Sequence, residues 1–294
     1  MESFAGRAAS ELLERESEVA ALVALLDAAC AGTGRVALIE GPPGIGKSAL
    51  LESAKRLAPE RGMRVLAARG GALERDFSFG VVRQLFEPFV TADALVERGA
   101  LFEGAAGIAA ELLGAQPPAG TQPPSGELFA LLHGLHWLTA GIAADGPLLI
   151  ALDDAHWADI PSLRFAQYLA RRLDELPVLL AMTARSTEPD APLELIDAIA
   201  GEPVASTIRP GPLSAAAAGD VLRELFATEP DAEFVRASHE ASRGNPFLLT
   251  ELARALAADG SAPDSAASAS IRHVRPEAIT RKALVRLGHL PLAG

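Results

Sequence analysis

A glycine-rich stretch, EGPPGIGKSALL at residues 40–51, constrains the fold more than any other part of this 294-residue chain. It satisfies the spacing G-x-x-x-x-G-K-[ST] through Gly41, Gly46, Lys47 and Ser48. An apolar run rich in β-branched residues, RVALIE, precedes it, and KSALLESAKRLA follows with helical periodicity and is expected to end before Pro59. This order of strand, loop and helix predicts a phosphate-binding loop and disfavours the alternative of a Gly/Pro surface turn.

The residue types of this loop suit phosphate chemistry. Glycines let successive backbone N–H groups converge on an anion, and the helix that begins near Lys47 adds its positive end. The ammonium of Lys47 would reach the outer phosphates, and the hydroxyl of Ser48 would bind Mg²⁺. Lysine is otherwise rare, since only Lys55 and Lys282 join Lys47 in the whole chain. The expected cofactors are therefore ATP or ADP with Mg²⁺.

Two adjacent acids end a second apolar run, PLLIALDD at residues 147–154. A run of this length and composition is typical of a strand that is covered on both faces. Asp153 would then hold Mg²⁺ through water, and Asp154 would orient or deprotonate the attacking water. The alternative is that both acids merely end a strand and cap the next helix. Because aspartate is one methylene shorter than glutamate, we expect slow ATP hydrolysis.

Arg185 follows a third apolar run, in the sequence AMTARS. If that strand lies beside the strand before the phosphate loop, Arg185 could contact the γ-phosphate through a charge-assisted hydrogen bond. The alternative is an ordinary surface arginine after a strand. His156 lies beside Trp157, where a histidine packed under the indole ring is favoured over a catalytic one.

Alternating strands and helices predict an α/β fold in which helices wrap a parallel sheet. This nucleotide-binding domain is expected to span residues 1–210, with an exposed Pro/Gly-rich loop at 114–126. From residue 211 the strands stop, and residues 211–260 predict a small helical lid domain. The composition of residues 261–270 predicts a linker, and residues 271–294 begin a further helix.

Charge and hydropathy exclude several classes of partner. A net charge of −12 with no dense basic run argues against direct nucleic-acid binding by this segment. No apolar run approaches the ~20 residues of a membrane-spanning helix, and no basic-then-apolar signal pattern opens the chain. The single Cys30 excludes an internal disulfide and is expected to be a small buried residue. A cytoplasmic location is therefore expected.

Five stretches in this order carry a family resemblance: LLERESEVAAL, GPPGIGKSALL, PLLIALDDAHWAD, LLAMTARS and SRGNPFLLTEL. The chain resembles the signal-transduction ATPases with numerous domains (STAND), which are related to the AAA+ proteins. Within them it is most similar to the ATPase module of large ATP-binding regulators of the LuxR family, such as the bacterial maltose regulator. The resemblance runs from about residue 12 to 256, and DDAHWAD and GNPF are its most specific parts.

This resemblance implies a P-loop sandwich with strand order 5-1-4-3-2, followed by a helical lid and the start of a truncated winged-helix domain at 271–294. It implies that adenine lies between a GRExE-like segment, here Arg15, Glu16 and Glu18, and the lid proline Pro246. The family usually has glycine where this chain has Glu14, which would be strained if that position needs a positive φ.

Three hypotheses follow for function. The first is a nucleotide-operated switch in a bacterial transcriptional regulator, which ADP holds closed and ATP with a partner signal opens. ATP-dependent homo-oligomerisation would belong to the parent protein. The second is a P-loop kinase that phosphorylates a small acceptor, and the third is a scaffold that does not hydrolyse ATP.

The predicted site residues fall into three groups. The nucleotide-binding group comprises Gly41, Pro43, Gly44, Ile45, Gly46, Lys47, Ser48, Ala49, Arg15 and Pro246. The catalytic group comprises Lys47, Asp154 and Arg185, and the metal group comprises Ser48 and Asp153.

Overall fold

The computed structural model describes residues 12–73, 75–89, 99–114, 127–185, 188 and 191–271. The chain forms two compact units: a core unit, Ser17–Pro42 with Lys47–Arg209, and a helical unit, Met1–Glu16 with Pro43–Gly46 and Pro210–Gly294. Residues 115–126 of the loop expected over 114–126, and residues 272–294 of the winged-helix segment expected over 271–294, lie outside the described residues.

The core unit is built on one five-stranded parallel sheet. Its strands are β1 (Arg35–Glu40), β2 (Arg64–Arg69), β3 (Leu148–Asp153), β4 (Val178–Ala184) and β5 (Ala205–Ile208). Their order, β2-β3-β4-β1-β5, confirms the predicted order read from the other edge. The carboxyl ends of β1 to β4 therefore meet at one edge of the sheet, where parallel α/β folds place their ligands.

The short strand β5 was not recognisable in the sequence as a strand. It has four residues, carries Ser206 and Thr207, and pairs with β1 alone at the edge of the sheet. An edge strand is only partly covered, so it lacks the continuous apolar run that predicted β3 and β4.

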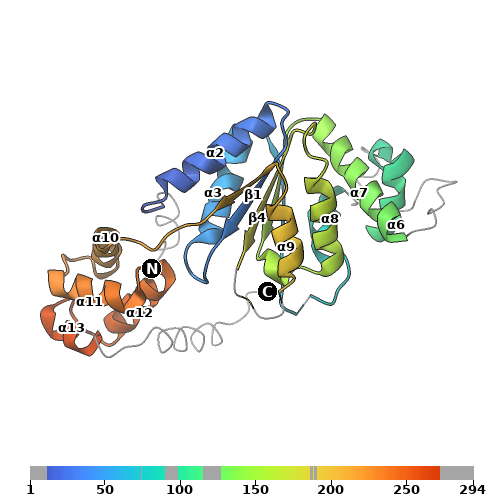
Figure 1. Cartoon of the computed structure of the whole chain (residues 1–294). Coiled ribbons are helices and arrows are strands. Elements are labelled where there is room, and N and C mark those ends of the chain that lie inside the picture. The colour runs from blue at the N-terminus through green and yellow to red at the C-terminus, as the bar shows by residue number, and fades with distance from the viewer. Residues whose placement is uncertain are drawn as a thin grey trace. The chain divides into compact units, whose positions relative to one another are not determined.

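Helices cover both faces of the sheet, with α2 and α3 on one side and α8 and α9 on the other (Figure 1). Within the described residues of the core unit, the α-helices are α2 (Glu16–Cys30), α3 (Lys47–Glu60), α4 (Gly80–Phe86), α6 (Ile108–Leu112), α7 (Glu127–Ala144), α8 (Ile160–Ala170) and α9 (Leu193–Ala200). The 3₁₀ turns are η1 (Glu87–Phe89), η2 (Gly99–Phe102), η3 (Gly104–Gly107) and η4 (Ala155–Trp157). No helix in the described segments is long and apolar enough to cross a membrane.

Two local predictions are corrected. Helix α3 continues through Pro59 to Glu60, because a proline in the last turn removes only one intrahelical hydrogen bond. Cys30 is exposed rather than buried, because it is the last residue of α2 and lies on its solvent side.

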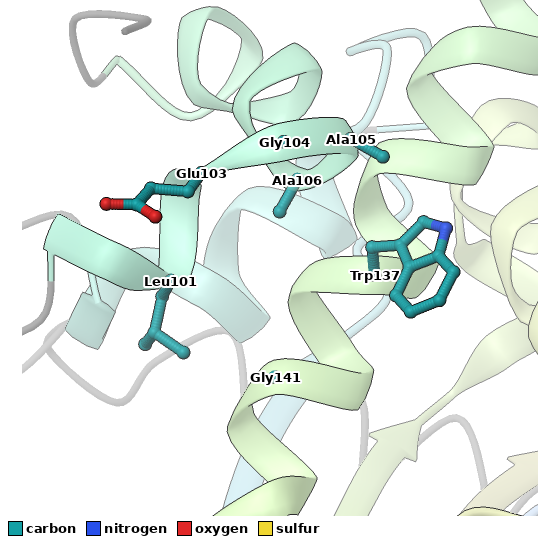
Figure 2. A pocket seen from close by; sticks show the side chains of 7 residues that line it. All are labelled: Leu101, Glu103, Gly104, Ala105, Ala106, Trp137 and Gly141. Atoms are coloured by element: carbon teal, nitrogen blue, oxygen red, sulfur yellow. The ribbon is translucent and has the colours of Figure 1, made fainter.

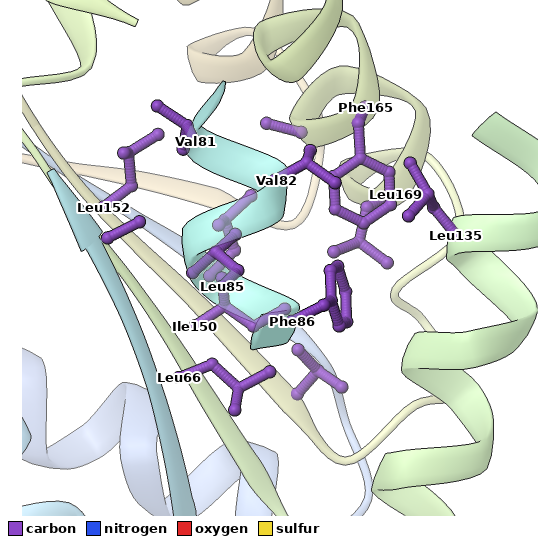
Figure 3. Packing of buried hydrophobic residues seen from close by; sticks show 14 of the residues in the cluster. Leu66, Val81, Val82, Leu85, Phe86, Leu135, Ile150, Leu152, Phe165 and Leu169 are labelled. Atoms are coloured by element: carbon purple, nitrogen blue, oxygen red, sulfur yellow. The ribbon is translucent and has the colours of Figure 1, made fainter. Parts of the chain in front are cut away.

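The larger buried cluster lies between the sheet and helices α4, α7 and α8. Strand residues such as Leu66 and Ile150 pack there against α4, and the rings of Phe86 and Phe165 meet edge to face at 6.0 Å (Figure 3). Strand residues two apart share a face, so Leu148, Ile150 and Leu152 all enter this cluster. This packing makes β3 a rigid support for the acids at its end.

Asp159 caps two helices at once. Its Oδ1 accepts from the backbone N–H of Ser162 at 2.9 Å, which caps α8, and from that of Phe79 at 2.8 Å. Its Oδ2 accepts from the N–H of Val81 in α4 at 3.3 Å. Asp159 is only 2% exposed, so one buried carboxylate satisfies backbone donors at both helix starts.

In the part of the helical unit that the structure describes, four helices pack around an apolar cluster of their own. They are α10 (Ala215–Phe226), α11 (Ala232–Ser242), α12 (Pro246–Ala258) and α13 (Ser265–Ile271). Members of the cluster include Leu222, Phe234, Leu249, Leu252 and Ile271.

Helix α13 occupies most of the segment that was predicted to be a linker over 261–270. Asp264 caps it by accepting from the N–H of Ala267, and Ile271 is fully buried. Small Ala and Ser residues gave this segment a linker-like composition, but they also allow α13 to pack closely.

Candidate functional site

The phosphate-loop motif connects β1 to α3, as the sequence predicts. Gly44 and Gly46 have φ values of 77° and 106°, a region that favours glycine. Ile45 is buried, whereas Pro43, Ser48 and Ala49 are exposed. Helix α3 begins at Lys47, so its N-terminal backbone donors lie at the end of the loop.

The Lys47 ammonium is held at the start of the loop. Its Nζ donates to the carbonyls of Gly41 at 2.8 Å and Pro42 at 2.9 Å, and the residue is 6% exposed. Burial, followed by the charge of Arg185, lowers the pKa of Lys47. An ammonium has three N–H donors, and within the described part of the chain only these two are used. One donor therefore remains for a further acceptor.

Ser48 and Asp153 are 105 residues apart in sequence and hydrogen-bonded in the structure. The Ser48 hydroxyl donates to Asp153 Oδ1 at 3.0 Å, and the Thr183 hydroxyl donates to the same oxygen at 2.6 Å. Thr183 also accepts from the backbone N–H of Asp154 at 2.8 Å. The threonine at the end of β4 thus orients both acids at the end of β3.

The oxygens of Ser48 and Asp153 fit Mg²⁺. A carboxylate and a hydroxyl are hard oxygen ligands, and Mg²⁺ usually takes only one or two protein ligands beside water and phosphate oxygens. The described residues contain no cluster of three or more His, Cys, Asp or Glu side chains that could hold a metal. The donor set therefore matches a phosphate-bound Mg²⁺ rather than a metal held by protein alone.

Arg69 at the end of β2 holds Asp154. Its Nη2 and Nε donate to Asp154 Oδ2 at 2.7 and 3.1 Å, and this hydrogen bond raises the pKa of Arg69. Arg69 Nε also lies 3.9 Å from Asp153 Oδ2. No sequence pattern singles out Arg69, because the pairing of β2 with β3 is what brings it next to the acids.

His156 lies buried beneath this pair of acids, as expected for a histidine packed against Trp157. It is 0% exposed, neither ring nitrogen has a hydrogen-bond partner, and its ring centroid is 5.4 Å from that of Trp157. Its Nε2 is 3.8 Å from Asp154 Oδ1. Burial is the main cause that lowers the pKa of His156 to about 4, so the ring is neutral at pH 7.

Arg185 follows β4, which lies between β1 and β3 as predicted. Its Nη1 forms an ion pair with Glu188 Oε2 at 2.7 Å. Its charge contributes to the lowered pKa of Lys47, which places it in the electrostatic surroundings of the loop. Contact between Arg185 and a γ-phosphate stays a prediction.

The N-terminal segment and the start of α10 are joined in the helical unit. Arg15 is 5% exposed, and its Nη2 donates to the carbonyls of Gly211 at 2.6 Å and Ile45 at 3.3 Å. Glu14 has a φ of 53°, the left-handed conformation that its family position suggested. Its carboxylate accepts from both the backbone N–H and the hydroxyl of Ser214. These two bonds offset the backbone strain that a non-glycine residue carries there.

Pro246 is the first residue of α12, and Asn245 caps that helix. The Asn245 Oδ1 accepts from the N–H groups of Phe247 and Leu248, and its Nδ2 donates to the carbonyl of Pro43 at 2.9 Å. The GNPF motif thus contacts the tip of the phosphate loop through its asparagine, a contact that sequence reasoning did not predict.

A separate pocket of about 500 Å³ lies in the core unit, between α7 and the turns η2 and η3 (Figure 2). Trp137 forms one wall, and Leu101 and Glu103 lie across from it. None of the predicted site residues lines this pocket, so the chemistry derived above does not take place there.

Comparison with known proteins gives a family match and several structural relatives. The sequence pattern of the AAA ATPase domain family matches residues 11–181. An uncharacterized protein of Rhizobium meliloti (strain 1021) is 30% identical over 227 residues, which cover 70% of this chain and 21% of that protein. The chain thus spans about a fifth of the relative's length.

Several solved structures align with this chain at low sequence identity. The Walker-type ATPase PABY2304 of Pyrococcus abyssi aligns with a TM-score of 0.54 at 14% identity, covering 94% of this chain and 72% of that one. The Orc1 protein of Aeropyrum pernix, solved in complex with DNA, aligns with a TM-score of 0.50 at 18% identity, covering 96% and 70%. A STAND protein with a tetratricopeptide repeat sensor, PH0952 from Pyrococcus horikoshii, aligns with a TM-score of 0.47 at 16% identity, covering 83% and 30%.

Proposed function

The chain belongs to the AAA ATPase domain family, and on that premise we propose that it is an ATP- and ADP-binding switch module that hydrolyses ATP slowly. Membership of this family of P-loop ATPases implies nucleotide binding. The observation that carries the proposal is the convergence of the Ser48 and Thr183 hydroxyls on one carboxylate oxygen of Asp153, at the end of the sheet from which the phosphate loop leaves β1.

Phosphate binding is assigned to the loop and Lys47. The N–H groups of Gly44, Ile45 and Gly46, with the remaining donor of the Lys47 ammonium, would bind the phosphate oxygens. Because Lys47 is partly desolvated, its charge acts on a phosphate with less screening than a surface lysine would.

Ser48 and Asp153 would hold Mg²⁺, which when bound neutralises phosphate charge and orients the leaving group. Thr183 keeps Asp153 Oδ1 directed at Ser48. Asp154 is the candidate to orient or deprotonate the attacking water. Its short side chain and its two hydrogen bonds from Arg69 both favour slow turnover.

The wider role rests on motif resemblance. DDAHWAD, GNPF and the loop resemble the ATPase module of LuxR-family regulators, so we place this segment in a bacterial signal-responsive transcriptional regulator. Adenine recognition is assigned to Arg15 and Pro246. Signal sensing, DNA binding and ATP-dependent oligomerisation would belong to other parts of the parent protein, since the Rhizobium relative is about five times as long as the matched region.

Titration calorimetry with ATP and with ADP, each with Mg²⁺, tests the proposal. The wild-type protein should bind both, and Lys47→Ala should weaken binding roughly 10- to 100-fold, the equivalent of one hydrogen bond to a charged group. Lys55→Ala is the matched control, because Lys55 lies on the same helix and forms its ion pair with Glu52 at the surface. Steady-state hydrolysis should be well below the ~10 s⁻¹ typical of enzymes.

Two outcomes would favour the other hypotheses. Absence of nucleotide binding, or Lys47→Ala indistinguishable from wild type, would indicate a scaffold. Transfer of phosphate to a nucleoside or sugar in a phosphoryl-transfer screen would indicate a kinase. Hydrolysis at many turnovers per second without a partner would contradict the switch.

A further inference from the structure

Five successive carbonyls of the phosphate loop, from Gly41 to Ile45, each accept a hydrogen bond. Lys47 binds the first two. The Pro43 carbonyl accepts from Asn245 Nδ2 at 2.9 Å, the Gly44 carbonyl from the backbone N–H of Phe247 at 3.3 Å, and the Ile45 carbonyl from Arg15 Nη2 at 3.3 Å. The last three donors all belong to the same compact unit as Pro43–Gly46.

Because the peptide bond is planar, a contact that fixes the direction of a carbonyl also fixes the direction of the next N–H group. In a trans peptide the C=O of one residue and the N–H of the next point in opposite directions. The carbonyls of Gly41 and Pro42 precede prolines, which have no N–H. The N–H groups of Gly44, Ile45 and Gly46 are therefore aimed by the contacts that Asn245, Phe247 and Arg15 make on the opposite side of the loop.

Asn245 can connect α12 to the loop because both ends of its side-chain amide form hydrogen bonds: the oxygen accepts and the NH₂ group donates. The first N–H groups of α12 need an acceptor, and Asn245 Oδ1 accepts from Phe247 and Leu248 at 3.1 Å each. With the oxygen turned to the helix, the NH₂ group faces the Pro43 carbonyl. The two segments are in close contact, since a Cβ on Gly44 would lie 2.7 Å from the Phe247 Cβ.

We propose that Asn245 is a positioning residue for phosphate binding: through its hydrogen bond to the Pro43 carbonyl it orients the peptide between Pro43 and Gly44. The inference rests on the proposed nucleotide binding. Because Asn245 caps α12, the helix that begins with Pro246, the placement of this helix affects how tightly the loop binds phosphate. A role as a helix cap alone would not need the amide donor, because Ser and Asp cap helices about as well as Asn.

Two substitutions separate the cap from the donor. Asn245→Ser and Asn245→Asp both keep an oxygen that can cap α12, and both remove the amide NH₂ group that donates to the Pro43 carbonyl. We expect both to weaken ADP binding roughly 3- to 10-fold, the range of one neutral hydrogen bond, with an unchanged melting temperature of the free protein. Asp264→Ser is the matched control, because the Asp264 carboxylate caps α13 rather than α12, and it should leave the ADP affinity unchanged.

NMR spectroscopy reports directly on the backbone N–H groups that would bind the phosphate. In a ¹H–¹⁵N spectrum of the wild type, ADP should move the Gly44 amide proton downfield, because a hydrogen bond to an anion deshields it. The movement should be smaller in Asn245→Ser.

The inference is overturned if both Asn245 variants bind ADP as tightly as wild type. It is also overturned if only Asn245→Asp loses affinity, which would indicate charge repulsion, or if affinity falls only together with the melting temperature. The wild-type and Lys47→Ala titrations identify a failure of the proposed function itself, since neither protein would then bind ADP.

Discussion

Arg69 donates twice to a single oxygen of Asp154, from Nη2 at 2.7 Å and from Nε at 3.1 Å, and leaves the other oxygen to face His156. This arrangement occupies Asp154 Oδ2 and turns Oδ1 toward a fully buried ring. The candidate water-activating group is therefore restrained by a residue on the neighbouring strand.

Removing the guanidinium should release Asp154. We expect Arg69→Met to raise the ATP turnover rate severalfold, because Oδ2 becomes available to water. The free energy of unfolding should change by less than about 1 kcal/mol, since the Arg69 side chain is 71% exposed and such ion pairs stabilise little. Phosphate-release kinetics and chemical denaturation measure the two effects.

Arg171→Met is the control for Arg69→Met, because Arg171 forms a similarly exposed ion pair with Glu202 and should leave turnover unchanged. A lower rate in Arg69→Met would show that Arg69 positions Asp154 for the reaction instead of restraining it.

Thr183→Val should weaken the dependence of nucleotide binding on Mg²⁺. The substitution keeps the size of the side chain and removes the hydroxyl that donates to Asp153 Oδ1 and accepts from the Asp154 N–H. We expect the Mg²⁺ concentration for half-maximal effect on ATP affinity to rise roughly 3- to 10-fold, as for one lost hydrogen bond. The control is Thr139→Val, which removes an equally buried hydroxyl in α7 and should leave this Mg²⁺ concentration unchanged. An unchanged Mg²⁺ requirement in Thr183→Val would argue against Asp153 as a metal ligand.

His156 should make folding sensitive to acid. Burial lowers its pKa to about 4, opposed by Asp154 and Glu188 and assisted by Arg185 and Lys47. The unfolded chain binds this proton below pH ~6.5. Between about pH 6.5 and 4 the unfolded state therefore holds more protons than the folded state, and stability falls as the pH falls. At about 1.4 kcal/mol per unit of pKa, the loss is on the order of 3 kcal/mol.

Denaturation curves of wild type and His156→Gln at pH 7, 5.5 and 4 measure this contribution. The variant should lose less stability than wild type over this range, because glutamine does not titrate. Parallel pH profiles for the two proteins would refute the assignment to His156.

Alanine at the two loop glycines should have unequal effects. At Gly46, φ is 106° and nothing lies within 4 Å of an added Cβ, so Gly46→Ala introduces backbone strain alone, about 1 kcal/mol or more. At Gly44, φ is 77° and the added Cβ would also lie 2.7 Å from Phe247 Cβ and 2.8 Å from Asn245 Oδ1. Thermal unfolding should show the larger loss for Gly44→Ala. Equal losses of stability in the two variants would mean that Phe247 and Asn245 shift away from the added Cβ without strain.

The sequence by itself determined the parts of this protein that depend on local spacing. The loop between a strand and a helix, the acids after a buried run and the strand–helix alternation all follow from residues close together in the chain, and the structure has them where the patterns predict. Local patterns failed where burial or composition was ambiguous: edge strand β5, the end of α3, exposed Cys30 and helix α13.

Only the tertiary structure decided which side chains act on these motifs. Arg69 meets Asp154 across 85 residues, Ser48 meets Asp153 across 105, and Asn245 meets Pro43 across 202. Each of these contacts depends on strand order or on the packing of a helix, and both are set by the burial of apolar surface over the whole unit rather than by nearby residues. A sequence motif therefore identifies the groups that can do the chemistry. The tertiary structure determines which neighbouring side chains orient and restrain those groups.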